Sequence, residues 1–440
     1  MTIRNDLNNR RQFLKTAAGT AVGVIGFPYI VPSSALGKAG DVAPSNRVTM
    51  GCIGVGWQGT SNLKSFIKEK DCQIVAISDI DKKHLRDAVS IVNGKYSNKD
   101  CATYHDFREL LARDDIDTVS IGLPDHWHAI PVIIAARSGK DIYGEKPLSH
   151  SLKEGRAMCD AVNRYGRIWQ TGSWQRSESH FRFACELVRN GRIGKIHTVE
   201  VGLPAGHSDF AKTKGQVQMG PPPSELDYDL WLGPAPYAPY CPARVHKNWR
   251  WHLDYGGGQL MDWIGHHVDI AHWGLGFDYA GPYEVAGDGE YPKDGLWNTA
   301  TKYRLTAKYP NDITMIIAGG HSDIRMGTKW IGEDGWVWVN RGGKVEAEPK
   351  KLVEEKFGPN DIHLFNSPGH WRNFLDCVKT RKATLTPCEV AHRSATPGHL
   401  GQIAMLLGRK IRFNPETEEI IDDPAATKML SRAMRSPWHI

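Results

Sequence analysis

Two side chains that can exchange protons stand four residues apart in the second half of the chain. Asp262 and His266 lie in the stretch Gly-Gly-Gly-Gln-Leu-Met-Asp-Trp-Ile-Gly-His-His, residues 256–267. Residues four apart on an α-helix share one face, so the carboxylate and the imidazole would point to the same side. Such a pair can orient a substrate and act as a general acid or base. The alternative is a structural pair, a capping aspartate and a hydrogen-bonded core histidine.

A lysine is a third candidate for proton transfer, because it directly follows a predicted strand. Lys146 follows the apolar run 141–144 within Glu145-Lys146-Pro147, so we expect it at the C-terminal end of a strand, where an open parallel sheet binds its ligand. A lysine that acts as a base must lose its proton easily. Burial and a nearby positive charge would favour that loss, and direct pairing with Glu145 would oppose it. The alternative is a solvated surface charge.

The histidine next to His266 raises the question of a metal site. Because residues one apart on a helix point in divergent directions, one ion cannot easily use both His266 and His267. The eight cysteines contain no Cys-x-x-Cys pair, which disfavours a thiolate zinc site and a disulfide framework. We therefore predict no bound metal and assign His267 to packing or substrate contact. A metal-assisted lyase or hydratase that uses His266 or His267 is the alternative.

Tryptophans are frequent, with 15 in 440 residues. Two tryptophan-containing segments, residues 174–176 and 249–252, fall in connections between predicted elements. Flat aromatic faces stack on the apolar faces of sugar rings, and Arg, Gln and His side chains can bind the hydroxyl groups. Core packing is the alternative for each tryptophan taken singly. The candidate substrate-binding residues are Trp174, Gln175, Arg176, Arg250, Trp251 and His267.

The elements that would position this chemistry begin with a glycine-rich turn. The run Val48–Ile53 predicts a strand, Gly54-Val55-Gly56-Trp57-Gln58-Gly59 follows at once, and a helix is predicted over residues 60–69. A second strand, predicted over 74–78, ends at Asp79, twenty positions after Gly59. A Gly-x-Gly-x-x-Gly turn between a strand and a helix, with an acidic residue at about this distance, is typical of a dinucleotide-binding unit. A glycine turn without a nucleotide is the alternative.

Each residue type in this unit has a physical role. Gly54 permits the tight turn, Gly56 lets the backbone approach a pyrophosphate, and Gly59 lets the helix pack close to the strand. The helix N-terminus offers free N–H groups to the phosphates. Asp79 could accept hydrogen bonds from ribose hydroxyls and would repel a 2′-phosphate, which favours NAD over NADP. Trp57 could cover the cofactor.

The alternation of strands and helices continues to residue 144. A buried strand is predicted over 117–123, a helix over 129–138 and another strand over 141–144. Pro124-Asp125-His126-Trp127-His128 follows the first of these strands, at the edge where a doubly wound sheet binds its ligand. The candidate cofactor-binding residues are Gly54, Gly56, Trp57, Gln58, Gly59, Asp79, Pro124, Asp125, His128, Glu145 and Lys146.

Taken together, the glycine turn, Asp79, residues 124–128, Glu145-Lys146-Pro147 and residues 256–266 resemble the Gfo/Idh/MocA family of sugar oxidoreductases. The resemblance implies an α/β fold: an N-terminal Rossmann domain with a doubly wound parallel sheet, and a C-terminal α/β domain with a large, mostly antiparallel sheet. It also implies dimers or tetramers built through the exposed face of that sheet.

The sequence after residue 172 agrees with such a second domain. Strand-like runs are predicted at 196–201, 301–308, 313–318 and 336–339, helices at 371–379 and 391–407, and a long irregular excursion at 205–250. We predict a Rossmann domain over 44–170 and a substrate and oligomerisation domain over 171–440, whose last helices could pack back on the first domain.

The N-terminus is typical of an export signal. Asn9-Arg10-Arg11-Gln12-Phe13-Leu14-Lys15 resembles the twin-arginine signature, a weakly apolar stretch covers 16–31, and small residues follow at 32–37. We therefore predict a signal peptide and linker over 1–40, a periplasmic location, and contact with the membrane only through that signal. A flexible basic N-terminus is the alternative.

Composition excludes several classes of protein. Hydrophobic residues make up 40% and charged residues 24% of the chain, which is ordinary globular composition. The sequence has no run of about 18 uncharged apolar residues, so a multi-pass membrane protein is excluded. Outside the first forty residues the net charge of +6 falls to 50 basic against 48 acidic residues, and this near balance argues against a nucleic-acid partner.

By the resemblance, Lys146 would polarise or deprotonate a sugar hydroxyl, His266 would act as acid or base, and Asp262 would orient the sugar or the histidine. We expect an NAD(H)-dependent oxidoreductase that acts on a small carbohydrate or glycoside, with a tightly held cofactor in a redox-neutral cycle. The alternatives are an ordinary sugar or inositol dehydrogenase with exchanging NAD, an NAD-dependent glycosidase or lyase that works by oxidation and elimination, and a non-catalytic protein that senses sugar or redox state.

Overall fold

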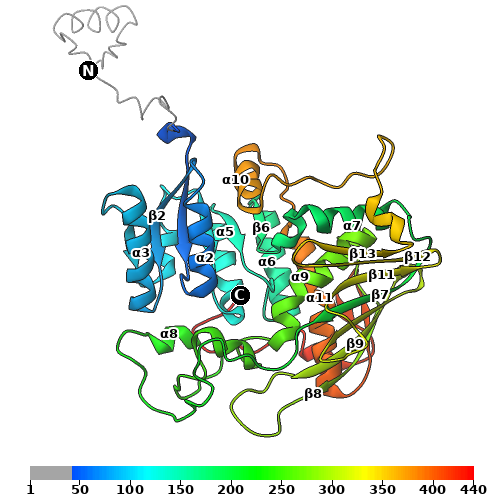
Figure 1. Cartoon of the computed structure of the whole chain (residues 1–440). Helices are drawn as coiled ribbons and strands as arrows, with labels where there is room; N and C mark the ends of the chain where they lie inside the picture. The colour runs from blue at the N-terminus through cyan, green and yellow to red at the C-terminus, as the bar shows by residue number, and fades with distance from the viewer. Residues whose placement is uncertain (1–41) are drawn as a thin grey trace, which may run out of the picture. The chain divides into compact units, whose positions relative to one another are not determined.

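The first half of the chain forms a six-stranded parallel sheet (Figure 1). The computed structural model describes residues 42–440. The strand order is β3-β2-β1-β4-β5-β6, and every pairing in it is parallel. Its elements are β1 Val48–Ile53, α2 Trp57–Phe66, β2 Cys72–Ser78, α3 Lys82–Tyr96, β3 Ala102–Tyr104, α4 Phe107–Leu111, β4 Thr118–Ile121, α5 Ala129–Arg137, β5 Asp141–Gly144, α6 Leu152–Arg164 and β6 Trp169–Thr171.

The central strands of this sheet are covered on both faces. All four residues of β4 and all four of β5 are buried, as is usual for parallel strands between layers of helices. The order of the strands reverses between β1 and β4, where an open sheet of this kind opens a crevice at its carboxyl edge. The glycine turn after β1, the segment after β4 and Lys146 after β5 all lie at that edge.

The second half of the chain forms a mixed, mostly antiparallel sheet of nine strands in the order β13-β12-β11-β7-β10-β9-β8-β14-β15. The β7–β10 pair is parallel and the other pairs are antiparallel. The strands are β7 Ile196–Leu203, β8 Glu284–Glu290, β9 Lys302–Tyr309, β10 Ile313–Gly319, β11 Gly327–Gly332, β12 Gly335–Asn340, β13 Lys344–Glu348, β14 Ile411–Asn414 and β15 Glu419–Ile420. The predicted fold class is confirmed.

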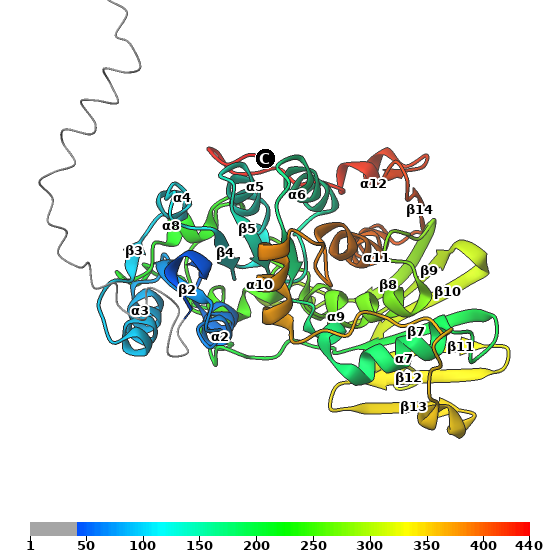
Figure 2. The same cartoon turned by 90° about the horizontal axis from the view of Figure 1, so that it is seen from above.

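One face of the nine-stranded sheet is covered by helices (Figure 2). These are α7 Ser179–Arg189, α9 Gly258–Leu275 and α11 Cys388–Leu407. Along β9 buried residues alternate with partly exposed ones, so Tyr303, Leu305, Ala307 and Tyr309 enter the core. Nearly all of α9 is buried, because α7, α11 and the sheet surround it. This central helix carries Asp262 and His266.

Small residues let α9 approach its neighbours closely. A Cβ atom added at Gly265 would lie 3.0 Å from Cβ of Lys146, and one added at Gly274 would lie 2.6 Å from the ring of Trp330. The helix is therefore seated against the sheet on one side and against the residue after β5 on the other. This seating brings the two halves of the sequence together at Lys146.

Two C-terminal helices also contact the first sheet. Phe374 and Leu375 of α10, His370–Thr380, lie in one core cluster with Met50 and Phe66, and Ala391 of α11 lies in another with Ile142 and Met158. Cys159 of α6 and Cys388 of α11 are free thiols with their Sγ atoms 3.3 Å apart. The end of the chain thus holds the two sheets in one packed unit.

Several predicted element bounds differ from the structure. The first helix begins at Trp57 rather than at residue 60 and ends at Phe66, because Gly59 sits in its first turn, where close contact with the strand requires it. The excursion 205–250 is irregular as predicted but holds α8, Tyr228–Leu232, and most of a 3-10 helix, η4 His246–Trp251. The strands β8 and β11 were not predicted, because their glycine and charged residues have low strand propensity and pairing with neighbours stabilises them instead.

The predicted signal peptide, residues 1–40, lies outside the described residues 42–440 and stays a prediction. Within the part of the chain that the structure describes, no helix combines the length and the apolar character that a membrane span requires. The two short C-terminal elements, β15 and α12, Pro424–Lys428, complete the chain.

Candidate active site

A cleft of about 450 Å³ runs along the carboxyl edge of the parallel sheet. It is lined by the glycine turn, by the ends of β2, β4 and β5, by the excursion 205–250, by α9 and by the turn after β12. Of the predicted residues, the cleft is lined by Gly54, Gly56, Trp57, Gln58, Asp79, Pro124, Asp125, Glu145, Lys146, Trp174, Arg250, Asp262 and His266.

The glycine turn has the geometry that a pyrophosphate needs. Gly54 has a φ of +76°, and a Cβ atom there would lie 2.6 Å from Leu123. A Cβ atom at Gly59 would lie 1.8 Å from the carbonyl oxygen of Gly54, so only glycine allows α2 to approach β1 this closely. At Gly56 the nearest atom to such a Cβ is 3.7 Å away, on His84. The backbone of Gly56 is therefore open to the cleft, and the residues fit a dinucleotide.

The acidic residue after β2 holds the turn in place. Asp79 Oδ2 accepts a hydrogen bond of 2.7 Å from the N–H of Val55, and Oδ1 accepts one of 2.8 Å from the N–H of Asp81. Burial raises the pKa of Asp79, and the nearby His84 and the two N–H donors oppose that rise. Because both oxygens are already engaged, Asp79 is less available to ribose hydroxyls than the sequence suggested.

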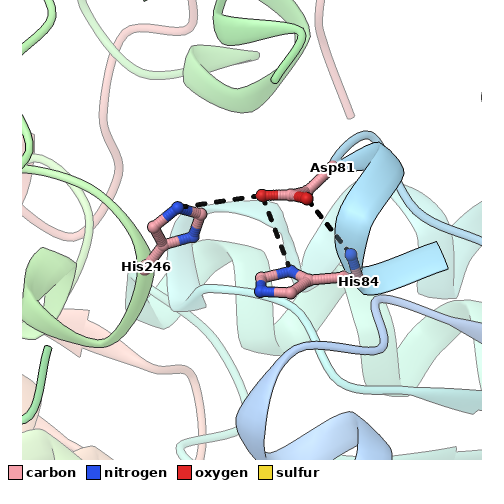
Figure 3. Close-up of side chains that lie close together, drawn as sticks. All are labelled: Asp81, His84 and His246. Carbon is pink, nitrogen blue, oxygen red and sulfur yellow. Dashed lines mark hydrogen bonds and ion pairs between the residues drawn. The ribbon is translucent and has the colours of Figure 1, made fainter. Parts of the chain in front are cut away.

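A second carboxylate, Asp81, stands two residues later beside two histidines (Figure 3). Asp81 Oδ1 caps α3 by accepting hydrogen bonds from the N–H groups of Lys83 and His84. Its Oδ2 faces His84 Nδ1 at 4.0 Å and His246 Nε2 at 3.8 Å. The ligand atoms of this group lie within 4.8 Å of one another, and all three residues line the cleft. Sequence reasoning missed this cluster, although an Asp-x-Asp pattern at the end of β2 was a signal for Asp81.

Lys146, Asp262 and Arg250 form a connected ion-pair group in the cleft. Lys146 Nζ donates hydrogen bonds of 2.9 Å to Asp262 Oδ1 and to the Asp262 carbonyl oxygen, and Arg250 Nε donates one of 3.0 Å to the same Oδ1. Burial alone would raise the pKa of Asp262, but the charges of Lys146 and Arg250 and their hydrogen bonds lower it below its usual value. Asp262 therefore fixes the lysine, rather than the histidine that the sequence left open as its partner.

His266 lies next to this group as a neutral imidazole. Burial lowers its pKa well below the usual value of 6.5, and the positive charges of Lys146 and Arg341 lower it further. Its ring contacts Trp174 and Trp263 with centroid distances of 6.3 and 5.5 Å, and its buried Nδ1 has no hydrogen-bond partner within residues 42–440. A neutral imidazole that lines the cleft can accept a proton.

Two buried carboxyl groups lie beside Lys146 without pairing with its Nζ. Glu145 Oε1 accepts a hydrogen bond of 2.8 Å from Asn62, and burial raises the pKa of Glu145. Burial also raises the pKa of Asp125 well above its usual value. The direct pairing of Lys146 with Glu145, which would oppose loss of a proton, does not occur.

A second arginine reaches the cleft from the turn after β12. Arg341 is held between Trp174 and Trp263, with ring centroids 4.6 and 4.3 Å from Cζ. Its Nε donates a hydrogen bond of 3.0 Å to Gln175 Oε1. The sequence did not indicate Arg341, because the turn reaches the cleft only through the pairing of strands that are distant in the sequence. It did not single out Trp263 either, which lies beside Asp262 on α9.

Several predicted residues do not line the cleft. His128 is buried, with its ring nitrogens 2.9 Å from the carbonyl oxygens of Leu123 and Pro147, so it joins the segments after β4 and β5. Gly59 serves helix packing, as described above. Gln175 is buried and supports Arg341, so it contacts the site rather than a substrate.

Three further substrate-binding predictions are wrong in position. Arg176 is buried in ion pairs with Asp269 and Asp278 behind α9. Trp251 is fully buried and stacks on His207. His267 lies in the core against the ring of Trp263, because consecutive residues of α9 face different sides and His266 is the one that faces the cleft.

Family models match both halves of the chain. One, described as "Oxidoreductase family, NAD-binding Rossmann fold", matches residues 48–173. The other, described as "Oxidoreductase family, C-terminal alpha/beta domain", matches residues 179–440. The first domain is thus an NAD-binding Rossmann domain.

Relatives of known name align with part of the chain. It is 30% identical over 208 residues to a glycosyl hydrolase family 109 protein of Shewanella pealeana, covering 43% of this chain and 44% of the relative. It is 31% identical over 205 residues to an alpha-N-acetylgalactosaminidase of Shewanella oneidensis, with the same coverage of 43% and 44%. The aligned part therefore spans about half the length of the curated relatives.

A solved structure shows the same fold over more of the chain. The WlbA dehydrogenase from Bordetella pertussis, in complex with NADH and UDP-GlcNAcA, matches with a TM-score of 0.61 and 16% identity over 84% of this chain and 98% of that chain. At this identity the likeness establishes the fold alone. Since the two family models together cover nearly all of residues 48–440, the chain belongs to the Gfo/Idh/MocA family of oxidoreductases.

Proposed function

We propose that the protein is an NAD(H)-dependent oxidoreductase that acts at a ring hydroxyl of a carbohydrate or glycoside and keeps its cofactor through a redox-neutral cycle. The observation that carries the proposal is the single cleft that joins the open glycine turn to Lys146, Asp262 and His266. The names of the relatives, a glycosyl hydrolase and an N-acetylgalactosaminidase, support a sugar as the substrate.

The residues of the cleft divide the reaction between them. When bound, NAD supplies a hydride acceptor for the carbon that carries the hydroxyl. His266 accepts the hydroxyl proton, since its lowered pKa keeps the imidazole neutral at neutral pH. Lys146 donates two hydrogen bonds to Asp262, and Arg250 donates one to the same carboxylate. Asp262 and Arg250 therefore act as positioning residues that hold the ammonium beside the substrate oxygen. Lys146 donates its remaining N–H to that oxygen.

The excursion 205–250 supports a retained cofactor. It is fastened to the segment between β2 and α3 by backbone hydrogen bonds from Lys82 to Glu225 and from Asp227 to Ile80, 2.9 and 3.2 Å long. Residues of this segment then line the cleft as a cover: Phe210, Leu226, Leu230, Trp231, His246, Lys247, Trp249 and Arg250. A covered dinucleotide exchanges slowly with solvent, because the cover must open first.

Contacts at Trp57 extend this cover over the glycine turn. Its side chain is 53% exposed, with the ring of Phe210 5.4 Å away and Nζ of Lys247 4.8 Å from its centroid. The carboxylates of Asp79 and Asp81 beside the turn support NAD over NADP, because they would repel a 2′-phosphate.

A glycosidase reaction is the second candidate, favoured by the names of the relatives. Oxidation of a hydroxyl to a ketone acidifies the neighbouring C–H bond, and loss of that proton lets the glycosidic oxygen leave. Water would then add to the double bond, and return of a hydride from the bound cofactor to the ketone would restore the hydroxyl. No net oxidation takes place, so a retained cofactor suffices.

A retained cofactor would suit an exported protein, and the N-terminal sequence predicts export. We propose that the twin-arginine route exports the folded protein to the periplasm, where a dissociable cofactor would not be replaced. Fractionation of the native cells tests the location.

The alternative of a non-catalytic sugar or redox sensor would not need Lys146, Asp262 and His266 together.

The enzymatic proposal is tested on protein taken from its native compartment. We expect mass spectrometry to identify NAD(H) after prolonged dialysis, which an ordinary dehydrogenase with exchanging cofactor would lose. Sugars and glycosides are then mixed with the protein in stoichiometric amounts, and the near-ultraviolet absorbance of reduced nicotinamide and the products are followed. Absence of any change across a broad panel would count against the enzyme.

Lys146→Ala tests the role of the lysine as a hydrogen-bond donor in the same assay. We expect its rate to fall by about 10²- to 10⁴-fold, because the substrate oxygen loses its donor, with the bound cofactor retained. Lys153→Ala, which changes an exposed lysine on α6, is the control. Equal rates for the two variants would contradict the assigned role of Lys146.

A further inference from the structure

Arg341 is a half-buried cation without a carboxylate partner in residues 42–440. Its single side-chain hydrogen bond among those residues goes from Nε to the neutral amide of Gln175, and its buried Nη2 has no partner. Burial lowers the pKa of Arg341 from 12.5 to about 10, although the more distant charges of Glu178 and Asp262 oppose that change. A buried charge without a counterion is unfavourable unless a ligand completes it.

Three other cations near α9 are paired. Lys146 and Arg250 share Asp262, and Arg176 pairs with Asp269 and Asp278. The other buried carboxyl groups of the cleft, Asp125 and Glu145, have raised pKa values because of burial, which weakens their tendency to ionise. The sugar end of the cleft therefore carries an excess of positive charge, and Arg341 is where that charge is not balanced.

The guanidinium is fixed in orientation. The rings of Trp174 and Trp263 both pack against it, and Gln175 holds Nε and is itself buried against His266 and His267. The same two tryptophan rings contact His266. A planar guanidinium held in this way keeps its buried Nη2 without a partner among the described residues, and such a fork can bind a carboxylate or another oxyanion.

We propose that the substrate sugar carries an anionic oxygen substituent, a carboxylate or a sulfate ester, and that Arg341 binds it. This inference rests on the proposed function, because it assumes that the cleft takes a sugar next to His266. Trp174 and Trp263 then have two roles, since they orient the arginine and offer aromatic surface to the sugar ring. An acidic sugar unit is thus the substrate class.

The test uses the full chain with its retained NAD. A panel of uronic acids, sugar sulfates and the corresponding neutral sugars is titrated, with tryptophan fluorescence and calorimetry as readouts of binding. The variants are Arg341→Gln, Arg341→Lys and Arg325→Gln; the last changes an exposed arginine of the segment before β11 that pairs with Glu346. Circular dichroism and retained NAD check that each variant is folded.

We expect wild-type protein to bind one class of acidic sugar more tightly than its neutral counterpart. Arg341→Gln should weaken the binding of the acidic sugar by about 10- to 100-fold. The affinity for neutral sugars should stay the same. Arg341→Lys should retain part of the binding of the acidic sugar, since it keeps the charge but loses the fork. Arg325→Gln should match wild type. Preference for uronic acids identifies a carboxylate, and preference for sugar sulfates identifies a sulfate.

Equal binding of acidic and neutral sugars by wild type, or an unchanged preference in Arg341→Gln, would overturn the inference. Cofactor reduction or product formation with neutral sugars alone would also overturn it, and the proposed function would stand. Binding of acidic sugars through Arg341 without any redox change or product would have the opposite meaning: the binding role would stand and the proposed enzyme activity would fall.

Discussion

At the scale of single residues, the chemistry depends on which side chains bind the carboxylate of Asp262 and which do not. Lys146 and Arg250 converge on one carboxylate, Asp262, and His266 stands beside them without a hydrogen bond to that carboxylate among the described contacts. The imidazole is therefore free to accept a proton from a substrate. Burial keeps it neutral, and the positive charges of Lys146 and Arg341 add to that effect.

This arrangement predicts the pH dependence of the rate. The base must be neutral, and the pKa of His266 lies well below 6.5, so the rate should stay high as pH falls through 6.5 and decline only when pH falls through the lowered pKa. Removal of a nearby positive charge raises the pKa of a histidine. In Arg341→Gln, assayed with a neutral sugar, the acid limb of kcat/KM should therefore move up by about one pH unit or less. An acid limb at or above pH 6.5 in wild type would contradict the assignment.

Local sequence predicted some of these residues and not others. Lys146, Asp262 and His266 could be predicted because each stands in a short motif at a strand end or on one helix face. Arg341 could not, since its position depends on the register of β12 in a nine-stranded sheet. The assignments of Arg176 and His267 failed because a sequence motif does not say on which side of a buried helix a polar residue finds its partner.

At the scale of elements, the close approach of α9 to the end of β5 positions the lysine. Gly265 has no side chain at the point where a Cβ atom would meet Lys146 at 3.0 Å. Gly265→Val should therefore displace the lysine and lower kcat by about 100-fold, while NAD stays bound. Gly94→Val on α3, where no atom lies within 4 Å, is the matched control. Rates are compared alongside thermal unfolding, and a normal rate in Gly265→Val would refute the positioning role.

The excursion 205–250 is held partly by its short helix α8. Asp227 caps that helix by accepting a hydrogen bond of 3.0 Å from the N–H of Leu230 and also contacts His105 at 2.8 Å. Asp227→Ala should loosen the cover and release NAD about 2- to 30-fold faster, as measured by timed gel filtration. Asp229→Ala, which changes an exposed residue in the first turn of the same helix, should release NAD at the wild-type rate. Equal rates for both variants would mean that the cover does not limit release.

At the scale of the whole molecule, the succession of strands and helices predicted the first domain, because parallel strands leave continuous apolar runs in the sequence. The second domain was predicted less completely. Strands such as β8 and β11 contain glycine and charged residues, and their partners in the sheet, rather than their own composition, fix their conformation.

The outer face of the nine-stranded sheet bears on the predicted homo-oligomer. On β9 the partly exposed positions include Lys302, Arg304 and Lys308. We predict a dimer or tetramer that uses this face, with light scattering as the measurement. Arg304→Glu should shift the mass toward the monomer if the face is used, and Arg86→Glu, a change on α3, should leave it unchanged. A monomeric wild type at all concentrations would exclude the assembly.

The return of α10 and α11 to the first sheet has a consequence for how the protein acquires its nucleotide. Because Phe374 and Ala391 complete the cores beneath the Rossmann strands, the nucleotide-binding half cannot finish folding until the last third of the polypeptide has been synthesised. Under the export proposed above, loading would be coupled to biogenesis, and each exported molecule would leave with the one dinucleotide it had captured before export.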